Sequence, residues 1–333
     1  MRSTTPRKIV AAIFLFSCAW VAFRHGVHFG RRPRHFGRQP ESCAHSETSV
    51  CALNAALART SSLYTAMFKE SNGDVISNIE APRQIKCLGT NMLLTQHRGD
   101  DSITQLEIEF AGQDTYGIKK ISSSSPLVLD IGGNIGFFSI LTHLLHPKSQ
   151  VIVFEPSPLT YFFLRLNLAL NNIPVLTSEE LQRHPERPGV YPVLGGVGAS
   201  KRVDLVSMSD PEVPKSKSQN GIAKVYQKGH IPLYNLNNFL ESHHLSERVF
   251  DIVKLDCECC EYRVIQDSEV WLANRSKVVS LTGEIHVCAH LGTDSEKQTL
   301  EALRRRGCEF PSFNFDKNSG RFREIANLND CCS

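Results

Sequence analysis

Leu127-Val-Leu-Asp-Ile-Gly-Gly-Asn-Ile-Gly136 predicts a short buried strand that ends in an acidic residue and turns through glycines into a helix. About twenty residues later, a second apolar stretch, 151–154, ends at Glu155 and Pro156. A strand, a glycine-rich turn, a helix and a second strand that ends in a carboxylate are typical of doubly wound α/β folds that bind an adenosine-containing cofactor. In such folds the glycines let the backbone approach the ligand, and the second carboxylate accepts hydrogen bonds from the ribose hydroxyls.

The spacing within this turn distinguishes between cofactors. The pattern Asp130-x-Gly132-x-Asn134-x-Gly136 places Asn134 where the dinucleotide fingerprint G-x-G-x-x-G has a glycine. An acid directly before the turn repels a pyrophosphate but attracts the cationic amino group of S-adenosylmethionine. No Lys follows Gly136, so the phosphate-binding pattern G-x-x-x-x-G-K-S/T is also absent. The alternative is a turn that needs glycine for packing alone. The sequence predicts S-adenosylmethionine as the cofactor, with binding residues Asp130, Gly132, Gly133, Asn134, Gly136 and Glu155.

The positive charge of the chain is concentrated at its start. With 333 residues, of which 41% are hydrophobic, the chain is long enough for one large domain with appendages. The net charge is +3, yet residues 1–40 hold eight of the 37 Lys and Arg residues and no acid. Removing these eight leaves 29 basic against 34 acidic residues, or about −5 for the rest. This distribution disfavours a nucleic-acid-binding body, which needs a basic surface.

Residues 9–23 form an uncharged, largely apolar block that follows Arg7 and Lys8. A membrane span needs roughly 20 residues, so the block is short for a plasma-membrane span but long enough for a signal sequence or a short anchor. We expect an uncleaved signal anchor over 1–24, followed by a basic flexible stalk over 25–48. The expected location is the Golgi or endoplasmic reticulum membrane, with the main body in the lumen. A cleaved signal peptide, giving a secreted protein, and an organellar presequence are the alternatives.

Eleven cysteines favour an oxidising compartment. Setting aside Cys18 in the apolar block leaves an even number, which permits full pairing into disulfides and leaves their connectivity open. Cys257-x-Cys259-Cys260 is also half of a zinc-ligand pattern, but no C-x-x-C partner pair occurs elsewhere, so we predict no zinc site.

The rest of the chain predicts an N-terminal extension over 49–121 and a main domain over 122–333. Within the extension, 50–69 has the apolar spacing of an amphipathic helix, and 84–120 alternates more like strands. In the main domain, strands alternate with helices, which predicts an α/β, Rossmann-like fold with a mainly parallel sheet covered on both faces. Strands are expected at 127–131, 151–154, 191–198, 250–256 and 278–286, helices at 135–146, 158–171 and 236–243, and a surface loop at 209–221.

Beyond the first turn, four further segments follow in a fixed order. They are Phe154-Glu-Pro156, Val253-Lys-Leu-Asp-Cys-Glu258, Glu261-Tyr262 and Gly283-Glu-Ile-His286. Together with the turn, they resemble the FkbM-type methyltransferases over residues 127–290. The resemblance implies a Rossmann-like, S-adenosylmethionine-dependent enzyme that methylates hydroxyl oxygens, often on sugars or sugar-bearing metabolites. The chain departs from the family pattern after Glu258, where Cys259 and Cys260 replace the usual small or glycine residues.

Four ionisable residues are the candidate catalytic groups: Asp256, Glu258, Glu284 and His286. They lie at or directly after the carboxyl ends of two predicted strands, and ligands in open parallel sheets bind outside such ends. Methyl transfer to a hydroxyl requires removal of a proton, and His286 suits a general base because imidazole titrates near neutral pH. Asp256 is the rival base, or orients the acceptor. A hydrogen-bonded network with a structural role and a divalent-metal site are alternatives, although we predict no metal. We expect Lys254 to pair with an acid and assign it no catalytic role.

The predicted activity is O-methylation of a hydroxyl on a glycan or small metabolite. A non-catalytic fold that binds S-adenosylmethionine is one alternative, and N-methylation of a protein or small amine is another. A nicotinamide-dependent dehydrogenase is disfavoured by the spacing of the turn. The expected partners are a hydroxyl-bearing acceptor and, through residues 1–24, a membrane.

Overall fold

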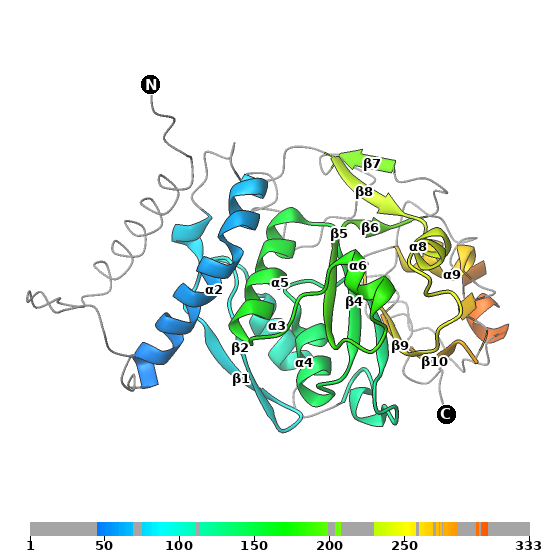
Figure 1. Cartoon of the computed structure of the whole chain (residues 1–333), viewed down its shortest axis with the longest axis horizontal. Coiled ribbons are helices and arrows are strands. Elements are labelled where there is room, and N and C mark those ends of the chain that lie inside the picture. Colours follow the sequence, from blue (N-terminus) through cyan, green and yellow to red (C-terminus); the bar gives the residue numbers. More distant parts are fainter. Residues whose placement is uncertain are drawn as a thin grey trace, which may run out of the picture.

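The computed structural model of the chain describes residues 45–68, 75–110, 114–198, 204–207, 230–257, 260–268, 271–272, 274, 276–284, 298–299 and 301–305. Its centre is a five-stranded sheet in the order β10-β9-β3-β4-β5, and every neighbouring pair is parallel. The strands are β3 (Leu127–Ile131), β4 (Gln150–Glu155), β5 (Gly189–Leu194), β9 (Phe250–Leu255) and β10 (Val278–Gly283). Counted along the chain, this order is 3-2-1-4-5, so the winding direction changes between β3 and β9. Figure 1 shows β4, β5, β9 and β10 of this sheet at the centre of the molecule.

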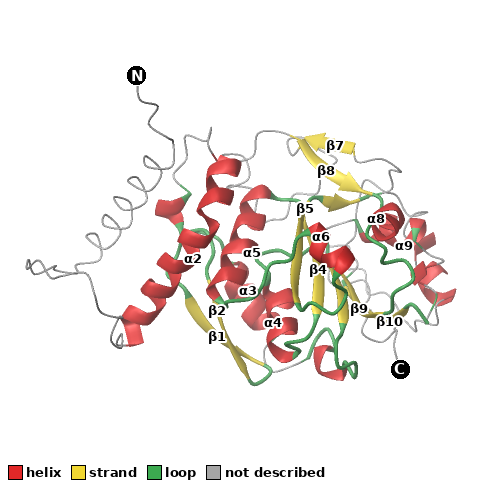
Figure 2. Cartoon of the chain, viewed as in Figure 1, coloured by secondary structure: helices red, strands yellow, loops and turns green. Residues whose placement is uncertain are grey.

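The side chains of the sheet alternate between two apolar clusters. Val128, Val151 and Ile252 pack on one face, whereas Leu129, Ile152 and Val253 pack on the other. Because both faces are buried, the central strands are mainly apolar instead of alternating regularly with polar residues, and Asp130 and Lys254 are buried exceptions. The predicted α/β fold with a parallel sheet covered on both faces is confirmed, and Figure 2 shows helices on either side of the strands.

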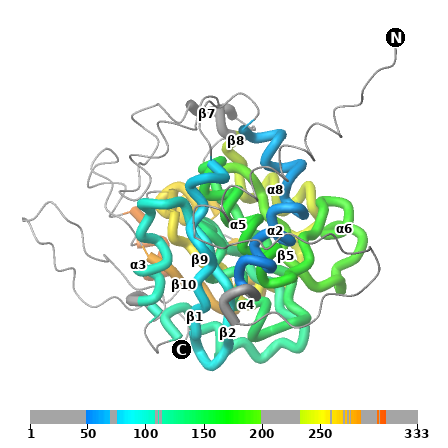
Figure 3. Tube along the Cα trace, turned by 90° about the vertical axis from the view of Figure 1, so that its left-hand side faces the viewer, coloured from blue at the N-terminus to red at the C-terminus, as the bar shows by residue number. Residues whose placement is uncertain are grey.

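Three helices lie on the face of Val128. They are α2 (His45–Phe68), α4 (Phe137–Leu145) and α5 (Pro158–Leu170). Beside them lie the antiparallel hairpin of β1 (Arg83–Cys87) and β2 (Thr90–Leu94), and α3 (Ser102–Glu109). Figure 3 looks onto this side of the molecule. One apolar cluster includes side chains from 45–121 and from the sheet, so this N-terminal part shares a core with the main domain.

The opposite face is covered by α6 (Ser178–Arg183), α8 (Leu236–Ser242) and α9 (Glu261–Asp267). Beyond the carboxyl end of β5 lies a small sheet in the order β6-β8-β7, made of β6 (Gly196–Val197), β7 (Asp204–Ser207) and β8 (His230–Tyr234). Two short 3₁₀ turns are η1 (Ile76–Asn78) and η2 (Ile118–Lys120), and helical residues are also described at 271–272, 298–299 and 301–305.

Most predicted elements of the main domain are confirmed within two residues at each end. The strand at 127–131 has the predicted bounds, and the helix expected from 135 begins at Phe137. The expected strand 278–286 is β10, which ends at Gly283, and residues 285 and 286 lie outside the described residues. The expected strand at 191–198 divides into β5, which begins at Gly189, and β6. The loop predicted at 209–221 also lies outside the described residues.

The prediction of strands over 84–120 is wrong for its second half. Residues 102–109 form helix α3. Leu106, Ile108 and Phe110 alternate as in a strand, but Ile103, Leu106 and Phe110 also recur at the spacing of three and four residues that is typical of a helix. Polar groups before the helix satisfy its first amides: Asp100 Oδ1 accepts from the Ser102 N–H, and Gln96 Oε1 accepts from the Ile103 N–H.

The predicted signal anchor, 1–24, lies outside the described residues. Among the residues that are described, no helix is both long and apolar enough to cross a membrane. Helix α2 begins at His45, within the last part of the predicted stalk.

Candidate functional site

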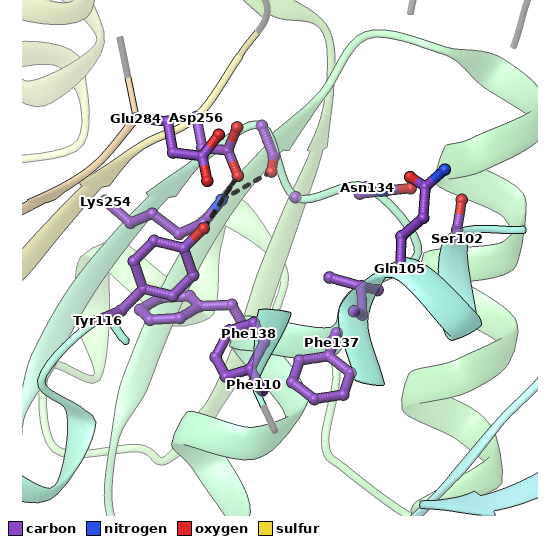
Figure 4. A pocket seen from close by; sticks show the side chains of 13 residues that line it. Ser102, Gln105, Phe110, Tyr116, Asn134, Phe137, Phe138, Lys254, Asp256 and Glu284 are labelled. Carbon is purple, nitrogen blue, oxygen red and sulfur yellow. Dashed lines mark hydrogen bonds and ion pairs between the residues drawn. The ribbon is translucent and has the colours of Figure 1, made fainter. Parts of the chain in front are cut away.

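A cavity of about 180 Å³ opens where the sheet reverses its winding, at the carboxyl ends of β3, β9 and β10. This is the position at which open α/β sheets bind ligands. One side of the cavity is lined by Gly132, Gly133 and Asn134 of the turn after β3, by Lys254 and Asp256, and by Glu284. The remaining lining residues are Ser102, Gln105, Leu106, Phe110, Tyr116, Phe137 and Phe138 (Figure 4).

The glycine turn is shaped by its own packing as well as by the cavity. Gly132 has φ +91°, and a Cβ there would lie 1.8 Å from the carbonyl oxygen of Asp256. A Cβ on Gly133 would lie 2.1 Å from a side-chain carbon of Val153. Glycine is therefore required at both positions because β9 and β4 approach the turn so closely. Packing accounts for glycine at these two positions, which also line the cavity, and their predicted contact with the cofactor stays a prediction.

Asn134 and Gly136 both adopt positive φ, at +48° and +93°. Asn is among the residues that tolerate this left-handed region, and Gly136 directly precedes α4. The Asn134 N–H donates to Glu155 Oε2 at 2.9 Å, which ties the turn to the end of β4. The sequence pattern thus has Asn and Gly at two positions of the turn where the backbone adopts positive φ.

Glu155 is almost completely buried and does not belong to the cavity lining. Its second carboxylate oxygen, Oε1, accepts from the Ser157 N–H at 2.8 Å. Burial raises the pKa of Glu155 to about 8, although the two backbone donors oppose the shift. A carboxylate has about four lone-pair sites, so Glu155 retains acceptor capacity beyond these two bonds. Its predicted contact with a ribose stays a prediction.

Asp130 is fully buried beneath the cavity. The Ser139 hydroxyl donates to its Oδ2 at 2.7 Å, and Lys254 Nζ lies 3.2 Å from its Oδ1. Burial raises the pKa of Asp130, while the Lys254 ammonium opposes this. Asp130 is thus linked to the cavity through Lys254. The contact between Asp130 and the amino group of the cofactor that the sequence predicts stays a prediction.

Lys254 is the centre of the polar side of the cavity. Besides Asp130, its ammonium donates to the carbonyl of Gly132 at 3.1 Å and pairs with Asp256 Oδ2 at 3.4 Å. The predicted pairing of Lys254 with an acid is confirmed. The rings of Tyr116 and Phe138 flank the ammonium at 5.5 and 5.7 Å from their centroids. Since a buried ammonium is stable only when paired, these contacts hold Lys254 in place.

Of the four predicted catalytic residues, the structure brings Asp256 and Glu284 together at the cavity. Figure 4 shows their carboxyl groups beside one another. The backbone fixes both, because the Asp256 N–H donates to Ile131 and the Glu284 N–H donates to Leu255. Glu258 and His286 lie outside the described residues. Among the residues that are described, no group of three or more His, Cys, Asp or Glu side chains could hold a metal ion.

The other wall of the cavity was missed by sequence reasoning. It comes from α3 and from the turn at Tyr116, both in the N-terminal part of the chain. Ser102, Gln105 and Asn134 form a polar group across the cavity from Asp256, and Phe110, Phe137 and Phe138 lie below (Figure 4). The sequence signal that could have revealed α3 is Asp100-Asp101-Ser102 before an apolar run, which is typical of a helix start.

The turn after β9 contains a disulfide between Cys257 and Cys260. Because a disulfide sulfur is not a thiolate, this pair is not available as the zinc half-site considered from the sequence. The Glu261 carboxylate, which belongs to the quoted motifs, is buried and accepts from the Cys257 N–H at 2.8 Å. The disulfide and this bond together fix the chain directly after Asp256.

No family model matches the chain, but its sequence is similar to those of several known methyltransferases. Methyltransferase 1 of Beauveria bassiana is 28% identical over 192 residues, covering 53% of this chain and 74% of that protein. Methyltransferase sdnD of Sordaria araneosa is 34% identical over 76 residues, 21% of this chain and 29% of that protein. The 31-O-demethyl-FK506 methyltransferase FkbM of Streptomyces tacrolimicus is 40% identical over 47 residues, 14% of this chain and 18% of that protein.

These relatives confirm the resemblance to FkbM-type methyltransferases. They support a methyltransferase, although the last two matches span less than a third of their own lengths. Among solved structures, the METTL16 methyltransferase domain matches with a TM-score of 0.33 and 14% identity, over 80% of this chain and 76% of that chain. The human methyltransferase 10 domain containing protein matches with a TM-score of 0.30 and 14% identity, over 80% and 93%.

Proposed function

We propose that the chain is an S-adenosylmethionine-dependent methyltransferase that methylates a hydroxyl oxygen. The observation that carries the proposal is the excess of carboxyl groups over ammonium groups at the glycine turn. Asp256 and Glu284 line the cavity together with one lysine, Lys254, and Asp130 lies behind that lysine. Even without Asp130, the carboxyl groups outnumber the ammonium group.

This charge balance favours a cationic donor over a dinucleotide. At an effective dielectric constant of 20, two unit charges 4 Å apart interact by about 4 kcal/mol. A pyrophosphate placed beside Asp256 and Glu284 would therefore be repelled, and Lys254 is already engaged by Asp130, Asp256 and the Gly132 carbonyl. A sulfonium or amino group in the same place would be attracted. The residues present thus fit S-adenosylmethionine.

Different parts of the site would hold different parts of this cofactor. Gly132, Gly133 and Asn134 line the cavity and would contact the amino-acid end, with Asp130 and Gly136 shaping the turn beneath. Glu155 at the end of β4 would accept from the ribose hydroxyls, as proposed from the sequence. When bound there, S-adenosylmethionine would supply an electrophilic methyl group to the acceptor oxygen, and S-adenosylhomocysteine would be the second product.

The acceptor hydroxyl loses a proton in this reaction, and a carboxylate of the cavity would take it. Asp256 is the described group best placed for this, because its side chain is 27% exposed and lies beside the turn. Glu284, beside it, would orient the acceptor (Figure 4). His286 follows Glu284 by two residues and stays a proposed alternative base. General-base assistance of this kind contributes about 10²–10⁴ in rate.

We further propose that the acceptor is a glycan or small hydroxyl compound of the secretory pathway. Two features support this location: the basic, apolar segment at residues 1–24 and the disulfide between Cys257 and Cys260. Disulfides persist in oxidising compartments and are rare in the cytosol. A microsome protease-protection assay should find the main domain shielded until detergent is added.

The test of the proposed activity measures donor binding and methyl transfer separately. Calorimetry should show binding of S-adenosylmethionine and of S-adenosylhomocysteine, and no binding of NADH. Transfer of a radiolabelled methyl group to a panel of oligosaccharides and hydroxyl metabolites should be lost at least hundredfold in Asp256→Asn. Glu241→Gln, which changes an exposed carboxyl group on α8, should behave as the wild type. NADH binding, or donor binding without transfer to any acceptor, would contradict the proposal.

A further inference from the structure

Tyr116 lies in a rigid turn between α3 and η2. The Asp114 carboxylate accepts from the N–H groups of Ile118 and Lys119 at 2.8 Å each, and the Gly117 N–H donates to the Asp114 carbonyl. The Tyr116 ring packs against Phe110 and Phe138, with centroids 5.2 and 5.5 Å away, and the residue is 2% exposed. Backbone and ring contacts therefore both fix the position of the ring.

The polar end of this ring reaches the acidic side of the cavity. The Tyr116 hydroxyl donates to Asp256 Oδ2 at 3.3 Å, and Lys254 Nζ lies 3.4 Å from the same oxygen. In Figure 4 the ring crosses from the aromatic floor of the cavity to this carboxylate. Asp256 Oδ2 thus receives one donor from β9 and another from the N-terminal part of the chain.

A tyrosine at this position needs an explanation, because phenylalanine would fill the same aromatic contacts. Burying a hydroxyl is unfavourable unless it forms a hydrogen bond, and here the bond goes to a cavity-lining carboxylate. A donor to a carboxylate favours its ionised form and restricts its orientation. A general base must be ionised and correctly oriented to take a proton from the acceptor hydroxyl, so both effects suit this role.

We propose that Tyr116 is a positioning residue that holds Asp256 in its proton-accepting orientation. The inference rests on the proposed function for its catalytic consequence. The N-terminal part of the chain thereby supplies a functional group as well as a wall of the cavity. Within the part of the chain that the structure describes, the charged or titratable groups beside Asp256 include Lys254 of β9 and Glu284 after β10, with Asp130 of β3 behind Lys254.

The variant Tyr116→Phe tests this directly, with Tyr64→Phe as its control. Tyr64 lies on α2, packs against Phe68 and Phe162, and does not line the cavity. The first measurement is the titration of the Asp256 carboxyl group, monitored by NMR in protein labelled at the aspartate carboxyl carbons. The Asp256 signal is assigned by its loss in Asp256→Asn. Its midpoint should rise in Tyr116→Phe and stay unchanged in Tyr64→Phe.

The second measurement is transfer of a radiolabelled methyl group to the panel compound that the wild type methylates fastest. In Tyr116→Phe, kcat should fall about ten- to hundredfold, as expected for one hydrogen bond to a charged group, while the KM for S-adenosylmethionine stays within about threefold. The acid limb of the kcat profile should move to higher pH. An unchanged Asp256 midpoint, or unchanged kcat with an unmoved profile, would overturn the inference. Absent transfer by the wild type would contradict the proposed function, and the titration alone would then decide whether Tyr116 holds Asp256.

Discussion

At the scale of single residues, the buried contact between Lys254 and Asp130 has a high desolvation cost. Both side chains are removed from water, and the side-chain exposures are 5% and 0%. Desolvation of two charges costs several kcal/mol per ion, and only good mutual geometry recovers it. Such a pair is therefore better explained by what it fixes, which is the end of β9 against the glycine turn, than by its contribution to stability.

Replacing Lys254 should show how strongly its neighbours depend on it. Lys254→Met leaves Asp130 buried without its cation and removes the donor to the Gly132 carbonyl, so we expect a loss of about 3–5 kcal/mol in the free energy of unfolding. The double variant with Asp130→Asn should recover part of the loss. As a control, Lys277→Met removes a surface pair with Glu247 and should cost less than about 1 kcal/mol. Urea unfolding measures all three; equal losses for Lys254 and Lys277 would contradict the argument.

Glu155 predicts a pH dependence of stability with a defined sign. Its pKa is about 8 in the folded chain against 4.5 for the ordinary side chain. Between these values the folded state holds a proton that the unfolded state has lost, so stability falls as pH rises. The loss is at most about 1.4 kcal/mol per pH unit and is complete above pH 8.

The variant Glu155→Gln removes this titration. The difference in unfolding free energy between wild type and variant should therefore shift against the wild type from pH 5 to pH 8. Urea unfolding at four pH values measures it, and subtraction removes the contribution of the other titrating groups. A difference that does not change with pH would show that Glu155 is ionised over the whole range.

At the scale of elements, helix α5 takes the place of a partner strand beside β2. Asn167 accepts from the Thr95 N–H at 2.8 Å and donates to the Thr95 and Ile135 carbonyls. One turn later, Asn171 accepts from the Leu93 N–H and donates to the Leu93 carbonyl. Four helical residues rise about 6 Å and two strand residues about 6.8 Å, so the two side chains match alternate residues of the strand. An edge that would otherwise expose unpaired backbone groups is thereby satisfied.

Asn167→Ala should be more costly than Asn171→Ala. Asn167 is fully buried, so its removal leaves three backbone groups of Thr95 and Ile135 without this partner, at an expected cost of about 2–4 kcal/mol. Asn171 is only partly buried, and water can replace part of its bonds, so about 1 kcal/mol is expected there. Chemical denaturation measures the costs, and amide exchange of Thr95 should quicken in the first variant only. Equal costs would mean that β2 is held by apolar packing.

Elements whose pattern was unambiguous could be predicted, and those with two compatible patterns could not. The strand at 127–131 is apolar on both faces and is followed by glycines that the backbone requires, so both its bounds and its turn were predictable. The segment of α3 fits two periods: Leu106, Ile108 and Phe110 alternate as in a strand, whereas Ile103, Leu106 and Phe110 have helical spacing. The choice depends on caps and on the packing of Phe110 against Tyr116 and Phe137. The helix α9 was missed, although α8, which also has seven residues, was predicted. Asn235 caps α8 with its side chain, whereas α9 begins after Cys260 without a side-chain cap.

At the scale of the whole molecule, one part of the site could be predicted from sequence motifs, and the other depends on packing between distant segments. The motif residues 130–136, 155, 256 and 284 belong to consecutive strand ends of one sheet, and the order of parallel strands places such ends along one edge. Tyr116 and α3 reach the cavity only through packing of the N-terminal part on α4. That packing depends on aromatic contacts between distant segments, for which a single sequence holds no periodic signal. The acidic half of the cavity was therefore predictable, and the aromatic half was not.

These contacts also predict that the main domain does not fold without the N-terminal part. Phe110 packs against Phe137 with ring centroids 4.5 Å apart, Tyr116 packs against Phe138, and Tyr64 and Phe68 pack against Phe162. Exposing a buried Phe costs about 1.5–3 kcal/mol. Uncovering Phe137, Phe138 and Phe162 together would therefore cost an amount comparable to the whole stability of a domain, about 5–15 kcal/mol.

A chain that begins at Ser122 should accordingly be insoluble or molten, with strong binding of the dye ANS and no cooperative unfolding in urea. A matched chain that begins at His45 retains α2, the β1–β2 hairpin, α3 and Tyr116, and should unfold cooperatively. Binding of S-adenosylhomocysteine by calorimetry should follow the same division, because Ser102, Gln105 and Tyr116 line the cavity. Cooperative unfolding of the shorter chain with undiminished binding would show that residues 45–121 are an appendage. Methyl transfer by the shorter chain at the rate of the longer one would also separate Tyr116 from the chemistry, since the shorter chain lacks that residue altogether.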